Sequence, residues 1–309
     1  MIEYDPHNWR SHLLDIRGSM VREIVWRMSF FIGWSLLVVA IVERFQLGVM
    51  LDLSVHSLVG LAIGLLLVFR TNSSYDRFWE GRKLWGGIVN TSRNLARAIT
   101  VHLPDQPQLQ RELLPWVIAF PYAAMHALRK PPFAEFAYNN ADECERPGSQ
   151  TPNLGVLSGA VEEDELRQLC ASQHLPLAVC CHITTTLKAA RDQGQISDYI
   201  FVSIDQYVGQ FIDLIGGCER IHKTPMPYAY MVHARRALIL YLLTLPLALC
   251  SKLHWWSAIA TACVAFVFLG IEEIGVEIED PFGQDDNDLP LEKICKTIEN
   301  NIVAIMPGD

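Results

Sequence analysis

The chain has 309 residues, half of them hydrophobic, and a mean hydropathy of +0.18, which is too apolar for a typical soluble domain. Its formal net charge of −9 and the lack of a basic stripe argue against nucleic acid as a partner. The eight cysteines form no CxxC pair, so we expect reduced, buried thiols and no disulfide framework. These features predict a membrane protein.

Four apolar runs approach the length of about 20 residues that a helix needs to cross a bilayer. They are residues 24–42, interrupted only by Arg27, then 51–69, 237–250 and 255–271. The last two are separated by a short polar turn and predict a transmembrane hairpin. A fifth run, 113–128, contains Pro115 and Pro121, and we expect it to form a pair of buried cytosolic helices.

Basic residues near the ends of the spans predict how the chain crosses the membrane. Those before span one are Arg10, Arg17, Arg22 and Arg27. Those after span two are Arg70, Arg77, Arg82 and Lys83, and those before span three are Lys223, Arg235 and Arg236. The two short hairpin loops carry only Arg44 and Lys252. Both termini and the long middle section are therefore expected in the cytosol. The N-terminus lacks a signal-peptide pattern, so we expect a multi-pass protein of the inner or plasma membrane.

The predicted organisation has four segments, all of them helical. Residues 1–71 hold spans one and two, 72–236 form a cytosolic helical domain, 237–271 hold spans three and four, and 272–309 form an acidic cytosolic segment. Outside the spans, helices are expected at 75–99, 162–170, 175–192, 197–221 and 291–302. No β-alternation competes with this interpretation.

Catalytic signatures are missing from the sequence: there is no glycine-rich phosphate loop, no G-x-S-x-G elbow and no H-E-x-x-H helix. We therefore expect no enzyme and no required cofactor. His174, Cys180, Cys181 and His182 are metal-binding residue types, but their spacing does not close a tetrahedral zinc site. Ordinary core cysteines and surface histidines are the expected interpretation.

Span two carries the pattern most suggestive of function. Leu58, Leu61, Leu65 and Phe69 recur at three- and four-residue intervals and share one helix face, while Gly60 and Gly64 lie on another. In a ring of subunits such an apolar face forms a narrow pore that dewets. Nearly every residue of this span is apolar, so any of its faces would show an apolar row. The polar residues 70–74, however, continue the helix without a proline or glycine that would end it. They predict a wetted vestibule below the constriction.

An acidic loop follows span four at residues 279–288. Clustered carboxylates around a Pro/Gly turn suit calcium, which takes six to eight oxygen ligands. The loop lacks the ligand spacing of an EF-hand. An acidic turn that caps the next helix explains the same residues equally well.

Three separated motifs resemble the bacterial branch of the bestrophin family. They read FRTNSSYDRFWEGR at 69–82, CERI and TPMPY at 218–228, and DPFG at 280–283. The resemblance implies an all-helical homopentamer around a single axial pore, with a hydrophobic neck at Leu61, Leu65 and Phe69. It also implies a second, lower aperture on the helix that starts at Leu175, for which we select Val179, with Ile183 as the next choice.

Two departures from the animal members of that family bear on ion choice and calcium. Animal members have phenylalanine rings in the neck, whereas Leu61 and Leu65 lack the positive ring edge that faces an anion. We therefore favour passive flow of monovalent cations such as sodium, with a chloride-selective channel as the alternative. In the acidic loop Gln284 and Asn287 alter the calcium ligands, so Asp280, Asp285 and Asp288 are candidates only.

A membrane enzyme and a non-conducting membrane scaffold are the remaining alternatives. The enzyme would need ionisable residues within the spans, where we find only Asp52 and His56 near one end. The scaffold would need a closed oligomer axis filled by protein. The continuous helix through span two favours a conduit.

Overall fold

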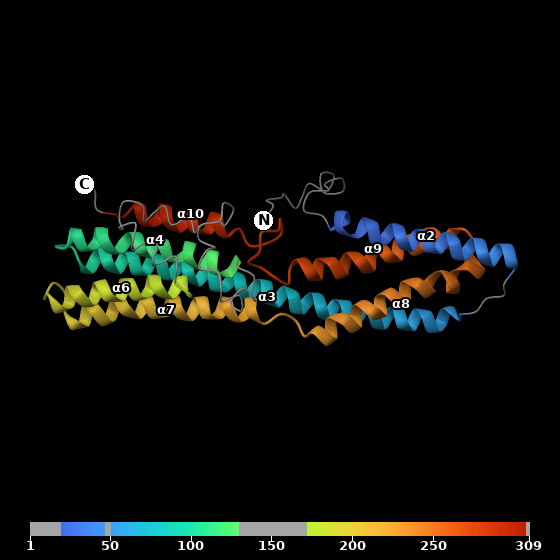
Figure 1. Cartoon of the computed structure of the whole chain (residues 1–309), viewed down its shortest axis with the longest axis horizontal. Coiled ribbons are helices and arrows are strands. Elements are labelled where there is room, and N and C mark those ends of the chain that lie inside the picture. The colour runs from blue at the N-terminus through green and yellow to red at the C-terminus, as the bar shows by residue number, and fades with distance from the viewer. Residues whose placement is uncertain (1–19, 47–50, 130–171, 307–309) are drawn as a thin grey trace. The chain divides into compact units, whose positions relative to one another are not determined.

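The computed structural model describes residues 20–46, 51–129 and 172–306, and every regular element in these ranges is a helix (Figure 1). The helices are α2 (Val21–Phe45), α3 (Leu53–His102), α4 (Pro107–Arg129), α6 (Leu175–Asp192), α7 (Asp198–Lys223), α8 (Tyr228–Leu253), α9 (Trp256–Glu277) and α10 (Leu291–Val303). The predicted all-helical class is confirmed. The helix predicted at 162–170 lies outside the described residues.

The chain divides into two compact units, and α3 contributes to both. The first unit contains the described residues up to Trp79, together with 225–281 and 285–288. The second contains 80–129, 172–224, 282–284 and 289–306. The sequence placed its boundaries at 71/72, 236/237 and 271/272. Apolar length set those positions, whereas α8 and α9 extend as helices beyond their apolar runs.

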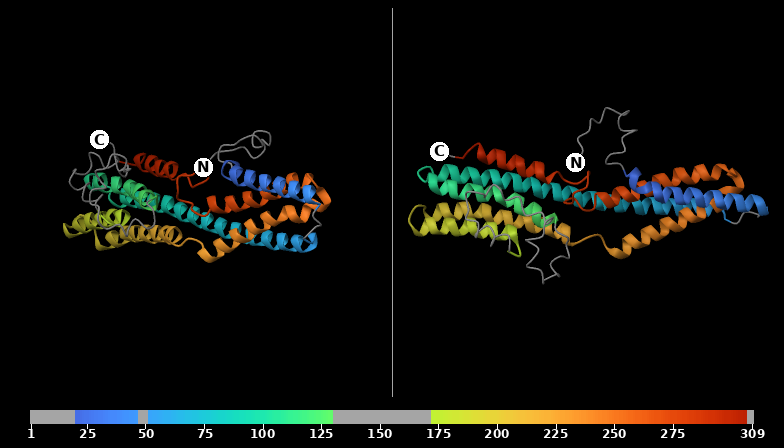
Figure 2. Two further views of the ribbon diagram at one scale, coloured as in Figure 1. Left: turned by 45° about the vertical axis from the view of Figure 1, so that its right-hand side comes forward. Right: turned by 45° about the horizontal axis from the view of Figure 1, so that its top comes forward.

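In the first unit, four helices are long and apolar enough to cross a membrane: α2, α3, α8 and α9. They lie alongside one another, with the beginning of α3 next to α8 (Figures 1 and 2). Their shared core consists of Ile24, Phe31, Ile63, Leu67, Leu238, Tyr241, Leu242, Leu245, Ala265 and Leu269. All four predicted spans therefore form part of one packed bundle.

Close approach of α3 and α8 depends on Gly60. A Cβ atom at this position would lie 2.6 Å from the hydroxyl oxygen of Tyr241. The Tyr241 ring cannot easily yield, because it is buried and stacks on His56 at a centroid distance of 4.3 Å. Gly60 therefore permits a close approach of the two helices, whereas a Cβ at Gly64 would meet no atom within 4 Å.

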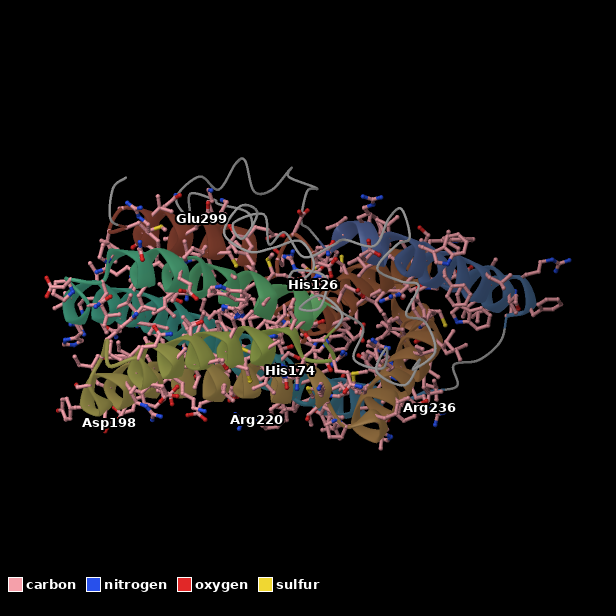
Figure 3. The ribbon with its side chains drawn as sticks, turned by 60° about the vertical axis from the view of Figure 1, so that its left-hand side comes forward. His126, His174, Asp198, Arg220, Arg236 and Glu299 are labelled. Carbon is pink, nitrogen blue, oxygen red and sulfur yellow. The ribbon has the colours of Figure 1, made fainter. Side chains whose placement is uncertain are left out.

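In the second unit, α4 packs against α6, α7 and α10. The rings of Phe120 and Phe211 stack at 4.0 Å between α4 and α7. The hydroxyl of Tyr122 donates a 2.6 Å hydrogen bond to the carboxylate of Glu299 on α10, a residue labelled in Figure 3. Aromatic packing and this hydrogen bond hold the helices of the unit together.

Two helices of this unit begin where the sequence predicts. The backbone N–H of Leu177 donates to Nδ1 of His174, the residue before α6, and Pro176 occupies the first turn. The N–H of Ile200 donates to the hydroxyl of Ser197, the residue before α7. The predicted bounds 175–192 are those of α6, whereas α7 begins one residue later and ends two residues later than the predicted 197–221.

The predicted helix pair at 113–128 is wrong, because both prolines lie inside the single helix α4. Each proline removes one backbone hydrogen bond, a cost of about 3 kcal/mol in an isolated helix. Here the run from Leu113 to Ala124 is buried throughout. Burying each large apolar side chain stabilises the fold by about 1.5–3 kcal/mol, which offsets the cost of the prolines and keeps the helix continuous.

Replacing Gly60 by alanine should destabilise the first unit, because the new Cβ overlaps the Tyr241 hydroxyl. We expect a loss of about 1–3 kcal/mol, the usual range for overpacking, measured as a lower unfolding midpoint by circular dichroism in detergent. Gly64→Ala is the matched control, since its Cβ meets nothing and alanine favours the helix. Equal shifts for the two variants would contradict this account.

Candidate ion-conduction site

One face of α3 is exposed along the whole apolar part of the helix. Leu58, Leu61, Leu65 and Phe69 have exposed fractions of 68, 64, 52 and 62 %. Their spacing of three and four residues places them in one row. The row continues, also exposed, through Asn72 and Asp76. An apolar row of this length on a described surface needs lipid or another subunit to cover it.

The opposite face of α3 is buried in the first unit. Ile63 and Leu67 enter the shared core, and Arg70 and Ser74 continue the buried row beyond them. The sequence predicted that residues 70–74 together line a wetted vestibule. That prediction is wrong for Arg70 and Ser74, which point into the bundle, whereas Asn72 and Ser73 are exposed.

Arg70 is the centre of a network of charges that sequence analysis missed. Its side chain is fully buried, and its Nη1 donates a 2.7 Å hydrogen bond to Oε1 of Glu272 on α9. The same oxygen accepts a 2.7 Å bond from Nε of Arg235 on α8. Arg27 on α2 lies 2.5 Å from Glu273 and 3.6 Å from Glu272. One charge cluster therefore joins all four spanning helices.

A signal for this cluster was present in the sequence. Arg27 interrupts the first apolar run, Arg70 ends the second, and Glu272 with Glu273 ends the fourth. Charges of opposite sign at the ends of spans pair readily, because an unpaired charge at the edge of the hydrocarbon layer is costly. Spacing along the sequence marks these arginines only as indicators of membrane orientation.

Val179 and Ile183 do not have the exposure that the predicted lower aperture requires. Both side chains are fully buried, within the face of α6 that packs inside the second unit. A side chain without exposed surface cannot line an aqueous passage, so this choice is corrected. The exposed positions of α6 include Leu177, Cys181 and Thr185, which recur every four residues and share another face.

The acidic loop after α9 is partly stabilised by its own side chains. The carboxylate of Asp288 accepts a 2.7 Å hydrogen bond from the backbone N–H of Asp285. Asn287 donates a 2.8 Å bond to Glu277, and the N–H of Met226 donates to Glu279 at 3.1 Å. Nε of Arg77 donates to the backbone carbonyl of Glu279 at 3.1 Å. The loop is thus tied to α3, to α9 and to the residues before α8.

The candidate calcium ligands do not form a complete site in this arrangement. Within the described ranges, no three His, Cys, Asp or Glu side chains come together as a metal ion would require. Burial, with a smaller contribution from the nearby carboxylates of Asp285 and Asp280, raises the pKa of Asp288 to about 6. The three acids therefore interact electrostatically.

The His174 region contains ordinary pairing and stacking contacts. Nε2 of His174 lies 2.7 Å from Glu219, the neighbour of the Arg220 labelled in Figure 3. The His182 ring stacks on Trp116 at 3.6 Å. Cys180 is buried, and burial raises the pKa of its thiol to about 12. Each of these side chains thus has a contact or an environment of its own, and no group of three metal-binding side chains forms among the described residues.

Comparison with known proteins reveals relatives along nearly the whole chain. Residues 1–304 match the family described as bacterial/fungal bestrophin protein. A voltage-dependent anion channel-forming protein of Synechocystis sp. is 36% identical over 301 residues, which cover 96% of this chain and 91% of the relative. The voltage-dependent anion channel-forming protein YneE of Escherichia coli is 31% identical over 306 residues, covering 99% and 94%.

Solved structures give the same result. The crystal structure of a bacterial bestrophin homologue from Klebsiella pneumoniae has a TM-score of 0.79 and 29% sequence identity to this chain. The match covers 92% of this chain and 98% of the other. The likeness therefore includes the spanning helices and the second unit alike.

Asp288 should make stability depend on pH. Its pKa is about 6 in the folded chain and 3.8 as a free group, so between these values the folded state binds the extra proton. The free energy of unfolding therefore falls as pH rises through this window. Asp288→Asn stays neutral but can still accept the Asp285 hydrogen bond, so it should lack this fall.

Thermal unfolding in detergent from about pH 4 to about pH 7 checks this expectation. The midpoint of the wild type should decline relative to that of Asp288→Asn. Asp286→Asn removes an exposed carboxylate from the same loop and serves as the control. Parallel profiles for the wild type and Asp288→Asn would show that burial does not perturb this carboxyl group.

Proposed function

Because the chain belongs to the bacterial and fungal bestrophin family, we propose that it is one subunit of a channel that passes monovalent ions through a hydrophobic neck. The observation that carries this proposal is the exposed apolar row of α3. Four large side chains would not stay exposed to water in the functional protein. Around the axis of a ring they form a constriction that dewets when closed.

The oligomer we propose is a homopentamer, with Leu61, Leu65 and Phe69 of each subunit forming the neck. The family resemblance supplies the subunit number, and the exposed row supplies the residues. Flow is passive, and the protein catalyses no reaction. The protein crosses the inner or plasma membrane four times, with both termini in the cytosol, because the basic residues flanking the spans favour that side.

A cation such as sodium is the ion we propose, although the relatives are named for anions. The comparisons do not support this preference; two features of the chain do. Leu61 and Leu65 lack aromatic edges that face an anion. Asp76 is the first charged side chain on the exposed row beyond Phe69, about 10 Å farther along the helix. A chloride-selective channel, favoured by the relatives' names, is the second candidate.

The lower aperture, in this proposal, uses the exposed face of α6. Leu177 is the large apolar residue of that face, with an exposed fraction of 42 %. It replaces Val179 and Ile183 because its side chain can reach an aqueous passage. The proposed function requires no cofactor, and calcium binding by Asp280, Asp285 and Asp288 in the acidic loop stays a prediction.

Leu65→Ala should increase current through the purified protein in planar bilayers. Shortening the side chain widens the neck and removes apolar surface, so the closed, dewetted state loses stability. We expect about a tenfold rise in open probability, equivalent to about 1.4 kcal/mol. Val59→Ala trims an exposed apolar residue on another face of α3 and should leave current unchanged. No current from wild type or Leu65→Ala, with the oligomer intact, would refute the channel.

Asp76→Asn should lower the ratio of cation to anion permeability. A ring of carboxylates concentrates cations near the neck, and its removal should reduce the ratio by about three- to tenfold. Reversal potentials under a salt gradient measure this ratio. Asp76→Glu keeps the charge and is the matched control. A wild-type reversal potential near the chloride equilibrium value would favour the second candidate.

A further inference from the structure

Arg70 directly follows Phe69, the last residue of the proposed neck. Neighbouring positions on a helix are rotated by about 100°, so one residue can face outward while the next faces the bundle. Phe69 is 62 % exposed, and Arg70 has no exposed surface. The orientation of α3 about its own axis at this level therefore sets both side chains at once.

The contacts of Arg70 fix that orientation. Its Nη1 donates to Glu272 at 2.7 Å, and its Nη2 contacts the sulfur of Met231 at 3.7 Å. Glu272 is itself almost fully buried, and the same carboxylate oxygen, Oε1, also accepts a hydrogen bond from Arg235. A guanidinium and a carboxylate buried together have a strict geometry, because separating them leaves the buried charge of Arg70 uncompensated, whereas Glu272 keeps its contact with Arg235.

Rotation of α3 that moved Phe69 out of its exposed position would pull Arg70 away from Glu272. Apolar neighbours such as Ile63 and Leu67 resist such a rotation less specifically, because one apolar contact can replace another. Directional hydrogen bonds between charged groups have no equivalent substitute in the bundle. The pair therefore opposes rotation at the one level of the helix where the neck ends.

We propose that the Arg70–Glu272 ion pair positions the neck, holding α3 in the rotation that presents Leu61, Leu65 and Phe69 to the channel axis. This inference rests on the proposed function and adds to it the element that controls the closed neck. Arg70 and Glu272 are positioning residues, since they act through the orientation of Phe69 and do not touch the passing ion. Breaking the pair frees α3 and lets the neck widen.

The test compares single-channel recordings of wild type, Arg70→Met and Arg70→Lys in planar bilayers, with unfolding midpoints measured in parallel. Arg70→Met removes the charge and should raise open probability about tenfold, which corresponds to about 1.4 kcal/mol in the gating equilibrium. Arg70→Lys retains the charge without the planar guanidinium, so its open probability should lie between those of wild type and Arg70→Met. The conservative variant separates loss of charge from loss of volume.

The matched control is Arg129→Met, which breaks another Arg–Glu pair, formed with Glu292 on α10 in the second unit. It should lower the unfolding midpoint and leave open probability within about twofold of wild type, because neither partner lies on α3. A merely structural role for Arg70 predicts the same pattern for Arg70→Met. Gating that changes only in the Arg70 variants supports a positioning role.

Glu272→Gln covers the case in which Arg70→Met does not assemble. This variant keeps the shape of the side chain and one hydrogen-bond acceptor, and it should also raise open probability. If the wild type conducts and the Arg70 and Glu272 variants have unchanged open probability, the positioning role is overturned and the proposed channel function still holds. Absence of wild-type conduction overturns the proposed function, and the inference with it.

Discussion

The buried ion pair between Arg70 and Glu272 is the constraint on which the membrane unit depends. Charges placed at the ends of apolar helices must meet partners, and here they meet in one cluster that includes Arg27 and Arg235. Because each partner comes from a different helix, the pairing determines which faces of α2, α3, α8 and α9 turn inward. Apolar packing alone would permit several rotations of each helix, since nearly all of their faces are hydrophobic.

Fixing α3 in one rotation has a consequence for its other side. The inward row holds Ile63, Leu67 and Arg70, so the row from Leu58 to Phe69 faces away from the bundle. Among the described residues, no part of the same chain covers that row. The proposed function follows from the same cause. A helix anchored by charge on one face presents a hydrophobic surface on the other, and in the proposed oligomer identical subunits share that surface around an axis.

The sequence predicted much of the fold because the determining signals are local. Apolar length located the four candidate spans, and helical periodicity located α6 and α7 to within two residues. The row of Leu61, Leu65 and Phe69 follows from helical spacing, and its exposure in the structure agrees with the predicted neck, although its place on an oligomer axis stays a proposal.

The errors concern properties that spacing does not determine. Val179 lies on the expected helix, but which face of α6 packs inward depends on α4 and α7. Pro115 and Pro121 mark a helix break only where surrounding packing is weak, and around α4 it is dense. Arg70 belongs to a polar stretch in sequence, yet its partner Glu272 is some 200 positions away, beyond the reach of any local pattern.

The most direct test of this account is a cryo-electron microscopy structure of the assembled protein in lipid nanodiscs. The account predicts a ring in which Leu65 side chains from all subunits lie nearest the axis, with Arg70 of each subunit within hydrogen-bond distance of Glu272 behind them. A structure in which the exposed row of α3 faces lipid, or packs against a neighbouring subunit away from the axis, would contradict it.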